Sequence, residues 1–173
     1  MNRNMEDLNS RFLTILNRVL RACEKRGYHL KPYCTKRDVW EQAKLYRQSR
    51  TWLEIKKDIS NLKNDGADFL AKVLLEVGPQ YGRWATNALP GFSWHQYGEA
   101  CDCFVLENYK AIWNPNHEGY LVFHEEAIKR GIVTLRTIHD ANHIQLKLHS
   151  PTFYYRIDTI DGIMKKSYKK VSK

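Results

Sequence analysis

The residues best suited to chemistry lie in the segment Ser93-Trp94-His95-Gln96-Tyr97-Gly98-Glu99-Ala100-Cys101-Asp102. It places the imidazole of His95 at the end of a loop and the carboxylate of Asp102 seven residues later, inside an apolar stretch. Zinc accepts both donor types at about 2.0 to 2.2 Å, and catalytic zinc sites use three protein ligands and leave the fourth position for water. The segment therefore indicates two ligands of a metal site, and the third must come from elsewhere in the chain.

The best candidate for the third ligand is His143, which ends the segment Asp140-Ala141-Asn142-His143. The carboxylate of Asp140 is placed to act as a general base on a metal-bound water. A single histidine is more often a hydrogen-bonded structural residue than a ligand. Asp102, however, lies between two cysteines in an apolar stretch, where an unpaired charge is costly, and a metal ion accounts for it better than pairing with an arginine or a capping role does.

Two patterns together resemble a known family. Ser93-x-His95-x-x-Gly98-x-Ala100-x-Asp102 and Asp140-x-x-His143-x-Gln145 are similar to the signature of the VanY-type D-alanyl-D-alanine carboxypeptidases and L-alanyl-D-glutamate peptidases, a family that includes many phage endolysins. Residues 37–46 with Arg50, and residues 85–91, extend the similarity, which runs from about residue 30 to residue 148. Four motifs in the right order are far more specific than any one of them.

The resemblance implies a role for each site residue. His95, Asp102 and His143 would bind zinc, and Asp140 would be the catalytic base. Arg37 would point its guanidinium at the scissile carbonyl and stabilise the oxyanion, and Ser93 would help to position the substrate. The chain departs from the family at Asp38, where serine is more usual, and at Ile144, where phenylalanine is more usual; the first departure leaves the substrate preference open.

The implied function is a zinc-dependent peptidase that cleaves peptidoglycan stem-peptide bonds involving D-amino acids. An L-Ala-D-Glu endopeptidase acting as a phage or prophage endolysin is favoured, because endolysins cut cross-linked wall. One alternative is a D-Ala-D-Ala carboxypeptidase of cell-wall remodelling, and another is a non-catalytic wall-binding module that contains zinc. A nucleic-acid-binding protein with structural zinc would need a fourth ligand, and the sequence shows none at a fitting spacing.

Composition sets the wider expectations. A formal net charge of +9 predicts attraction to a polyanion such as an anionic cell wall, whereas aromatic residues interleaved with the basic ones, typical of nucleic-acid platforms, are missing. The N-terminus has no signal-peptide pattern and no apolar run is long enough to cross a membrane. We therefore expect a monomer made in the cytoplasm, with its four cysteines reduced, that acts on the wall after release.

Hydrophobic periodicity predicts a mixed α+β fold, a small antiparallel sheet flanked by helices in a single domain, and the resemblance implies the Hedgehog/D-Ala-D-Ala peptidase-like fold. The predicted helices span residues 5–27, 38–49, 65–78 and 117–130, with an irregular charged connection between the second and the third. The predicted strands span residues 28–34, near an edge, 100–106, 132–135 and 143–148, and a long loop covers residues 81–98. We expect a zinc peptidase domain over residues 1–164 and a solvated or frayed basic tail over residues 165–173.

Overall fold

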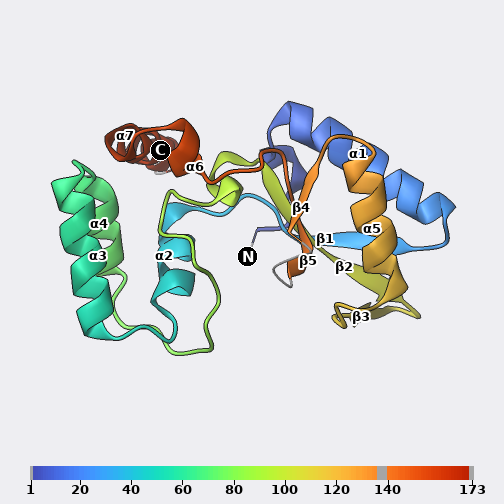
Figure 1. Ribbon diagram of the computed structural model, residues 1–173, viewed down its shortest axis with the longest axis horizontal. Coiled ribbons are helices and arrows are strands. Elements are labelled where there is room, and N and C mark those ends of the chain that lie inside the picture. Colours follow the sequence, from blue (N-terminus) through green and yellow to red (C-terminus); the bar gives the residue numbers. More distant parts are fainter. Residues whose placement is uncertain (1, 136–139, 172–173) are drawn as a thin grey trace. The chain divides into compact units, whose positions relative to one another are not determined.

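The computed structural model describes residues 2–135 and 140–171, which form helices and one antiparallel sheet (Figure 1). The chain divides into two compact units. Unit 1 consists of the residues up to 36 together with 97–148, and unit 2 of residues 37–96 together with those from 149 on. The α+β class with a small antiparallel sheet is thereby confirmed.

Unit 1 contains the sheet, whose described strands are β1 (His29–Cys34), β2 (Ala100–Glu107), β3 (Lys110–Ile112), β4 (Val133–Leu135) and β5 (Asp140–Gln145). Their order is β1-β2-β5-β4, and β3 adds a short pairing to β2. Among the described strands β1 lies at an edge, as its proline predicted. The two strands that carry Asp102 and His143 are therefore direct neighbours in the middle of the sheet.

One face of this sheet is covered by α1 (Ser10–Lys25) and α5 (Glu118–Ile128), which lie side by side in Figure 1. Cys101 and Cys103 point into the apolar core between the sheet and these helices. Because side chains alternate along a strand, Asp102 points to the opposite face. The expectation that the two cysteines are core residues is confirmed, and all four cysteines are thiols.

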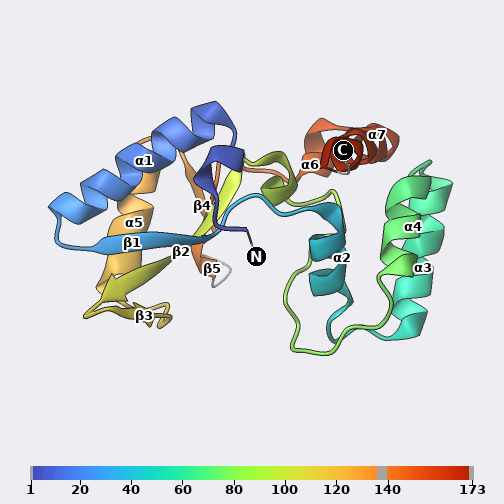
Figure 2. The ribbon, with the colours of Figure 1, turned by 180° about the vertical axis from the view of Figure 1, so that it is seen from behind.

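Unit 2 is helical: its α-helices are α2 (Val39–Arg47), α3 (Trp52–Asn64), α4 (Asp68–Glu76), α6 (Pro151–Tyr154) and α7 (Ile157–Val171). Helices α3 and α4 lie side by side, joined by a short turn, as Figure 2 shows from behind. The predicted cap of α2 is confirmed, because the carboxylate of Asp38 accepts a hydrogen bond of 2.7 Å from the backbone N–H of Glu41. The 3-10 turn η2 (Trp94–Tyr97) leads from the long loop toward β2.

The prediction of an irregular connection before α4 was wrong, because this segment forms α3. Thr51 and Glu54 make a capping box in which each side chain bonds to the other residue's backbone N–H. Ile55, Ile59 and Leu62 recur at helical spacing and are buried. Lys56, Lys57 and Lys63 of this segment are exposed. These charges made the narrow apolar stripe hard to recognise in the sequence.

Helix α7 continues to Val171, so residues 165–171, within the segment expected to be a solvated or frayed tail, are helical; residues 172 and 173 lie outside the described part. Ile160 and Met164 bury the inner face of α7. Asp161 accepts a hydrogen bond of 2.7 Å from the backbone N–H of Leu70, in the first turn of α4. That contact supplies the cap that Ala67, at the N-cap position of α4, lacks the side chain to make.

Two further elements, β3 and α6, were not predicted, and β5 begins three residues earlier than expected, at Asp140. None of the helices in the described ranges combines the length and the apolar character that a membrane span requires.

Candidate metal centre

Three potential metal ligands lie in one row across unit 1. Cys34 of β1 is the direct partner of Asp102 in β2, and Asp102 is the direct partner of His143 in β5. Residues directly opposite each other on antiparallel strands project to the same face. A thiol, a carboxylate and an imidazole therefore gather on the face of the sheet that α1 and α5 leave uncovered.

Cys34 reaches this row because of a bulge in β1. Pro32 pairs with Cys103, but the next pair joins Cys34 to Asp102, so that Tyr33 is the extra residue. Bulges are common beside functional sites, where they re-aim a side chain. The Cys34 sulfur and a carboxylate oxygen of Asp102 lie within 4.8 Å of each other, and Cys34 is fully buried.

Asp102 and His143 form a buried pair. The Nδ1 of His143 lies 2.8 Å from Oδ1 of Asp102, and each residue is 7% exposed. On its other side, Nε2 of His143 lies 3.0 Å from Oε1 of Gln145, whose amide group donates to the carbonyl of Lys147 and is thereby held in that orientation. Both ring nitrogens thus face oxygen acceptors, an arrangement that suits a protonated imidazole.

Electrostatics agree with this geometry. Burial alone lowers the pKa of His143, but the hydrogen bond and the charge of Asp102, with the charge of Asp140, more than offset it, so the pKa is raised above its ordinary value. Asp140 stands at the start of β5, half-buried, where its carboxylate acts on the same imidazole. A buried site with two carboxylates that favours a positive charge is also suited to a divalent cation in place of the proton.

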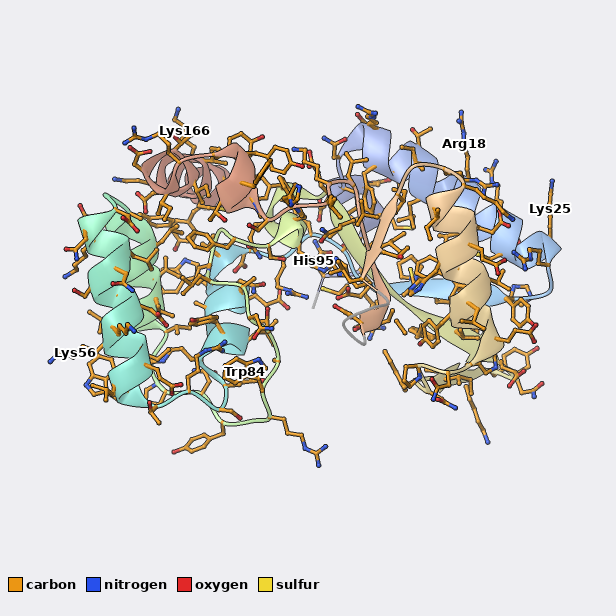
Figure 3. All side chains as sticks on the ribbon, in the orientation of Figure 1. Arg18, Lys25, Lys56, Trp84, His95 and Lys166 are labelled. Carbon is orange, nitrogen blue, oxygen red and sulfur yellow. The ribbon has the colours of Figure 1, made fainter. Side chains whose placement is uncertain are left out.

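His95 lies in η2 of unit 2, where Figure 3 labels it. It is buried, and its backbone N–H lies 3.4 Å from the hydroxyl of Ser93. Its carbonyl accepts a hydrogen bond of 3.1 Å from the backbone N–H of Arg37. The predicted ligand His95 and the two predicted substrate-binding residues are therefore connected to one another locally.

Arg37 is held by a buried amide network. Its Nη1 donates to Oε1 of Gln42 at 2.8 Å, and Nε2 of Gln96 donates to the same oxygen at 3.1 Å. The amide nitrogen of Gln42 in turn donates to the carbonyl of Ala88 and to the hydroxyl of Thr86. The Gln42 amide thereby connects Arg37 and η2 to the motif of residues 85–91, a connection that the sequence alone did not indicate.

Packing explains the glycines of two motifs. Gly98 has φ +67°, and a Cβ there would lie 2.9 Å from the carbonyl oxygen of Asp7 and 3.0 Å from the nitrogen of Asn9. Gly91 has φ +85°, and a Cβ there would lie 2.7 Å from Cγ2 of Ile160. Only glycine combines this backbone conformation with such close neighbours. These motif residues position the loop and the strand that carry His95 and Asp102.

Within unit 1 the structure brings together Asp102 and His143, and Asp140 acts on the latter. Within unit 2 it brings together Arg37, Ser93 and His95. The sequence analysis missed Cys34. Its position next to Asp102 depends on how β1 and β2 are paired, which the sequence does not show. The one signal in the sequence was that a cysteine can be a zinc ligand.

Comparison with known proteins identifies one family. Residues 5–127 match the family model VanY, described as D-alanyl-D-alanine carboxypeptidase. The matched range includes Arg37, Ser93, His95 and Asp102 and ends before Asp140 and His143. A search of the curated proteins gives no match.

Proposed function

The chain belongs to the VanY family, D-alanyl-D-alanine carboxypeptidase, and on this premise we propose that it is a zinc-dependent peptidase that cleaves stem-peptide bonds of peptidoglycan involving D-amino acids. The observation that carries the proposal is the buried contact of 2.8 Å between Asp102 and His143. Removing a carboxylate from water is costly unless a cation or hydrogen bonds compensate for it. A metal ion bound by this pair gives the burial a function.

In the proposed site Asp102, His143 and His95 hold one zinc ion. Imidazole and carboxylate donors match the coordination chemistry of zinc, and three protein ligands leave room for water. When bound, zinc would supply a Lewis acid that polarises the peptide carbonyl and lowers the pKa of the attacking water.

The protein's own residues carry the remaining steps. Asp140 takes the proton from the attacking water and passes it to the amine that leaves. Arg37, which stays charged at all working pH values, stabilises the negative charge that develops on the carbonyl oxygen. Ser93 helps to position the substrate. The amide of Gln42 restricts the guanidinium of Arg37, and such preorganisation is what makes a donor effective in the transition state.

For the bond cleaved, we propose an L-Ala-D-Glu endopeptidase acting as a phage or prophage endolysin, a monomer that reaches the wall after release from the cytoplasm. The family resemblance of the motifs supports this reading, since endolysins cut cross-linked wall. A D-Ala-D-Ala carboxypeptidase is the second candidate, and the description of the matched family favours it. The two differ in whether the substrate pocket accepts a longer chain or a free C-terminal carboxylate.

Mass spectrometry of purified peptidoglycan, digested with and without a chelator, tests the proposal. New stem-peptide termini between L-Ala and D-Glu that vanish on chelation are the expected result. Release of terminal D-Ala instead would identify the carboxypeptidase. Wall that stays intact with zinc present would contradict a peptidase and favour a non-catalytic wall-binding module.

A further inference from the structure

We propose that the thiolate of Cys34 is a further protein ligand of this metal ion, adding a sulfur donor to the histidine and aspartate set. The inference rests on the proposed function in that the same ion is bound. It goes beyond it because neither the motifs nor the family description assigns any role to Cys34, which the bulge of β1 places opposite Asp102.

The first argument is geometric. On a tetrahedral zinc ion with Zn–S of about 2.3 Å and Zn–O of about 2.0 to 2.2 Å, the two donor atoms are separated by about 3.5 Å. The Cys34 sulfur and the Asp102 oxygen already lie within 4.8 Å of each other. A shift on the order of 1 Å, within reach of side-chain rotation, brings both into the first coordination sphere.

The second argument comes from the other cysteines, all of which lie in the described part of the chain. Cys101 and Cys103 face the core, with their sulfur atoms 3.8 Å apart. Burial in the same core raises the pKa of Cys23 to about 11. Among the four cysteines, only Cys34 has Asp102 as its direct cross-strand partner. The three core cysteines therefore serve as matched references for it.

The chemistry of binding is balanced without an oxidant. The S–H bond of Cys34 breaks, the proton leaves to solvent, and the sulfur donates an electron pair to the metal ion. A thiolate ligand favours zinc over magnesium, calcium or manganese, which prefer oxygen donors. Zinc sites can expand their coordination, so a fourth protein donor would still leave a bound ion able to accept a water molecule.

Cobalt substitution tests this inference directly. Co²⁺ bound to a thiolate absorbs strongly in the near ultraviolet through sulfur-to-metal charge transfer, and Co²⁺ with only nitrogen and oxygen ligands does not. We expect this band in the wild-type protein and in Cys23→Ala, and its loss in Cys34→Ala. Zinc affinity should fall at least about tenfold in Cys34→Ala and stay unchanged in Cys23→Ala.

X-ray absorption of the zinc-loaded wild-type protein provides a measurement that needs no variant. A sulfur neighbour at about 2.3 Å is the expected result. A shell of only nitrogen and oxygen, or a cobalt band that persists in Cys34→Ala, would overturn the role of Cys34. In that case chelator-sensitive cleavage of peptidoglycan would still stand, whereas a protein that binds no zinc and cleaves nothing would overturn the proposed function itself.

Discussion

At the scale of single residues, the buried carboxylate of Asp102 is the feature that most needs an explanation, because burying a charge is costly. Asp102 stands in a strand whose neighbouring side chains enter the core, and the residue as a whole is 7% exposed. The sequence analysis interpreted this isolated carboxylate as a ligand and His143 as its partner. The contact between them is present in the structure, whereas their binding of zinc stays a prediction.

Replacing His143 by alanine should lower both the zinc content and the activity. The substitution deletes one proposed donor and leaves the Asp102 carboxylate buried without the imidazole beside it. Metal analysis of the purified variant, together with a peptidoglycan assay, measures both effects. His29→Ala, at an exposed position in the same unit, is the matched control and should retain full zinc. A His143→Ala protein that keeps one zinc per chain would exclude His143 as a ligand.

Replacing Asp140 by alanine should separate binding from catalysis. We expect the variant to retain zinc and to lose about a hundredfold or more in turnover, which is typical for the loss of a general base. Asp65→Ala removes an exposed carboxylate at the end of α3 and should leave the turnover unchanged. Unaltered turnover in Asp140→Ala would remove Asp140 from the mechanism.

At the scale of the elements, the sequence predicted features that depend on nearby residues and missed features that depend on residues far away in the chain. Asp38 predicted the start of α2 because its cap lies three residues away. The start of α4 depends on Asp161, which is 91 residues away in sequence, and no local pattern could have indicated it. The same holds for Cys34, whose approach to Asp102 depends on a bulge in an edge strand.

The capping of α4 by α7 predicts the effect of Asp161→Ala. Leu70 then loses the acceptor of its backbone N–H, and loss of a side-chain cap costs about 1 to 2 kcal/mol of unfolding free energy. Chemical denaturation measures this loss. Lys165→Ala, at an exposed position of the same helix, should change the stability little. Zinc content should not change in either variant, and equal stability of the two proteins would contradict the proposed cap.

Helix α5 predicts a defined dependence of stability on pH. Hydrogen bonds from Lys129 and Arg130, with a further one from Arg26, lower the pKa of Glu126 to about 2 from an ordinary value of 4.5. Because the folded-state pKa is depressed, the stabilisation is fully present above pH 4.5 and is lost as the pH falls toward about 2.

The variant Glu126→Gln should therefore be less stable than wild type at pH 7, by about 1 to 2 kcal/mol after allowance for solvent screening, and the difference should shrink as the pH is lowered. Thermal unfolding at several pH values measures it. Glu125→Gln, at the more exposed neighbouring position, is the control and should show a smaller difference. A difference between Glu126→Gln and wild type that does not vary with pH would contradict this account.

At the scale of the whole molecule, the proposed site residues come from both units of the chain. Asp102, Asp140 and His143 belong to unit 1, whereas Arg37, Ser93 and His95 belong to unit 2. In sequence, His95 stands two residues before the chain enters unit 1. Hydrophobic periodicity was sufficient to predict the class of the fold, and the motifs gave the roles of these residues, which stay predictions. The division of the chain into two units was not predictable, because it depends on contacts between distant segments.

Zinc should stabilise the folded protein as a ligand does. Binding to the native state alone adds about 2.7 kcal/mol at a free zinc concentration one hundred times the dissociation constant. The melting temperature should therefore rise with zinc and fall on chelation, and the rise should be much smaller in His143→Ala. A melting temperature that is the same with zinc and with chelator would argue against a native-state metal site.

The most direct measurement is a zinc titration of the chelator-treated protein, followed by the rate of peptidoglycan cleavage. The proposed centre predicts no cleavage without metal and a rate that rises linearly and levels off at one zinc per chain. Full cleavage by the metal-free protein would contradict a metallopeptidase, and so would an absence of cleavage after one equivalent of zinc has bound.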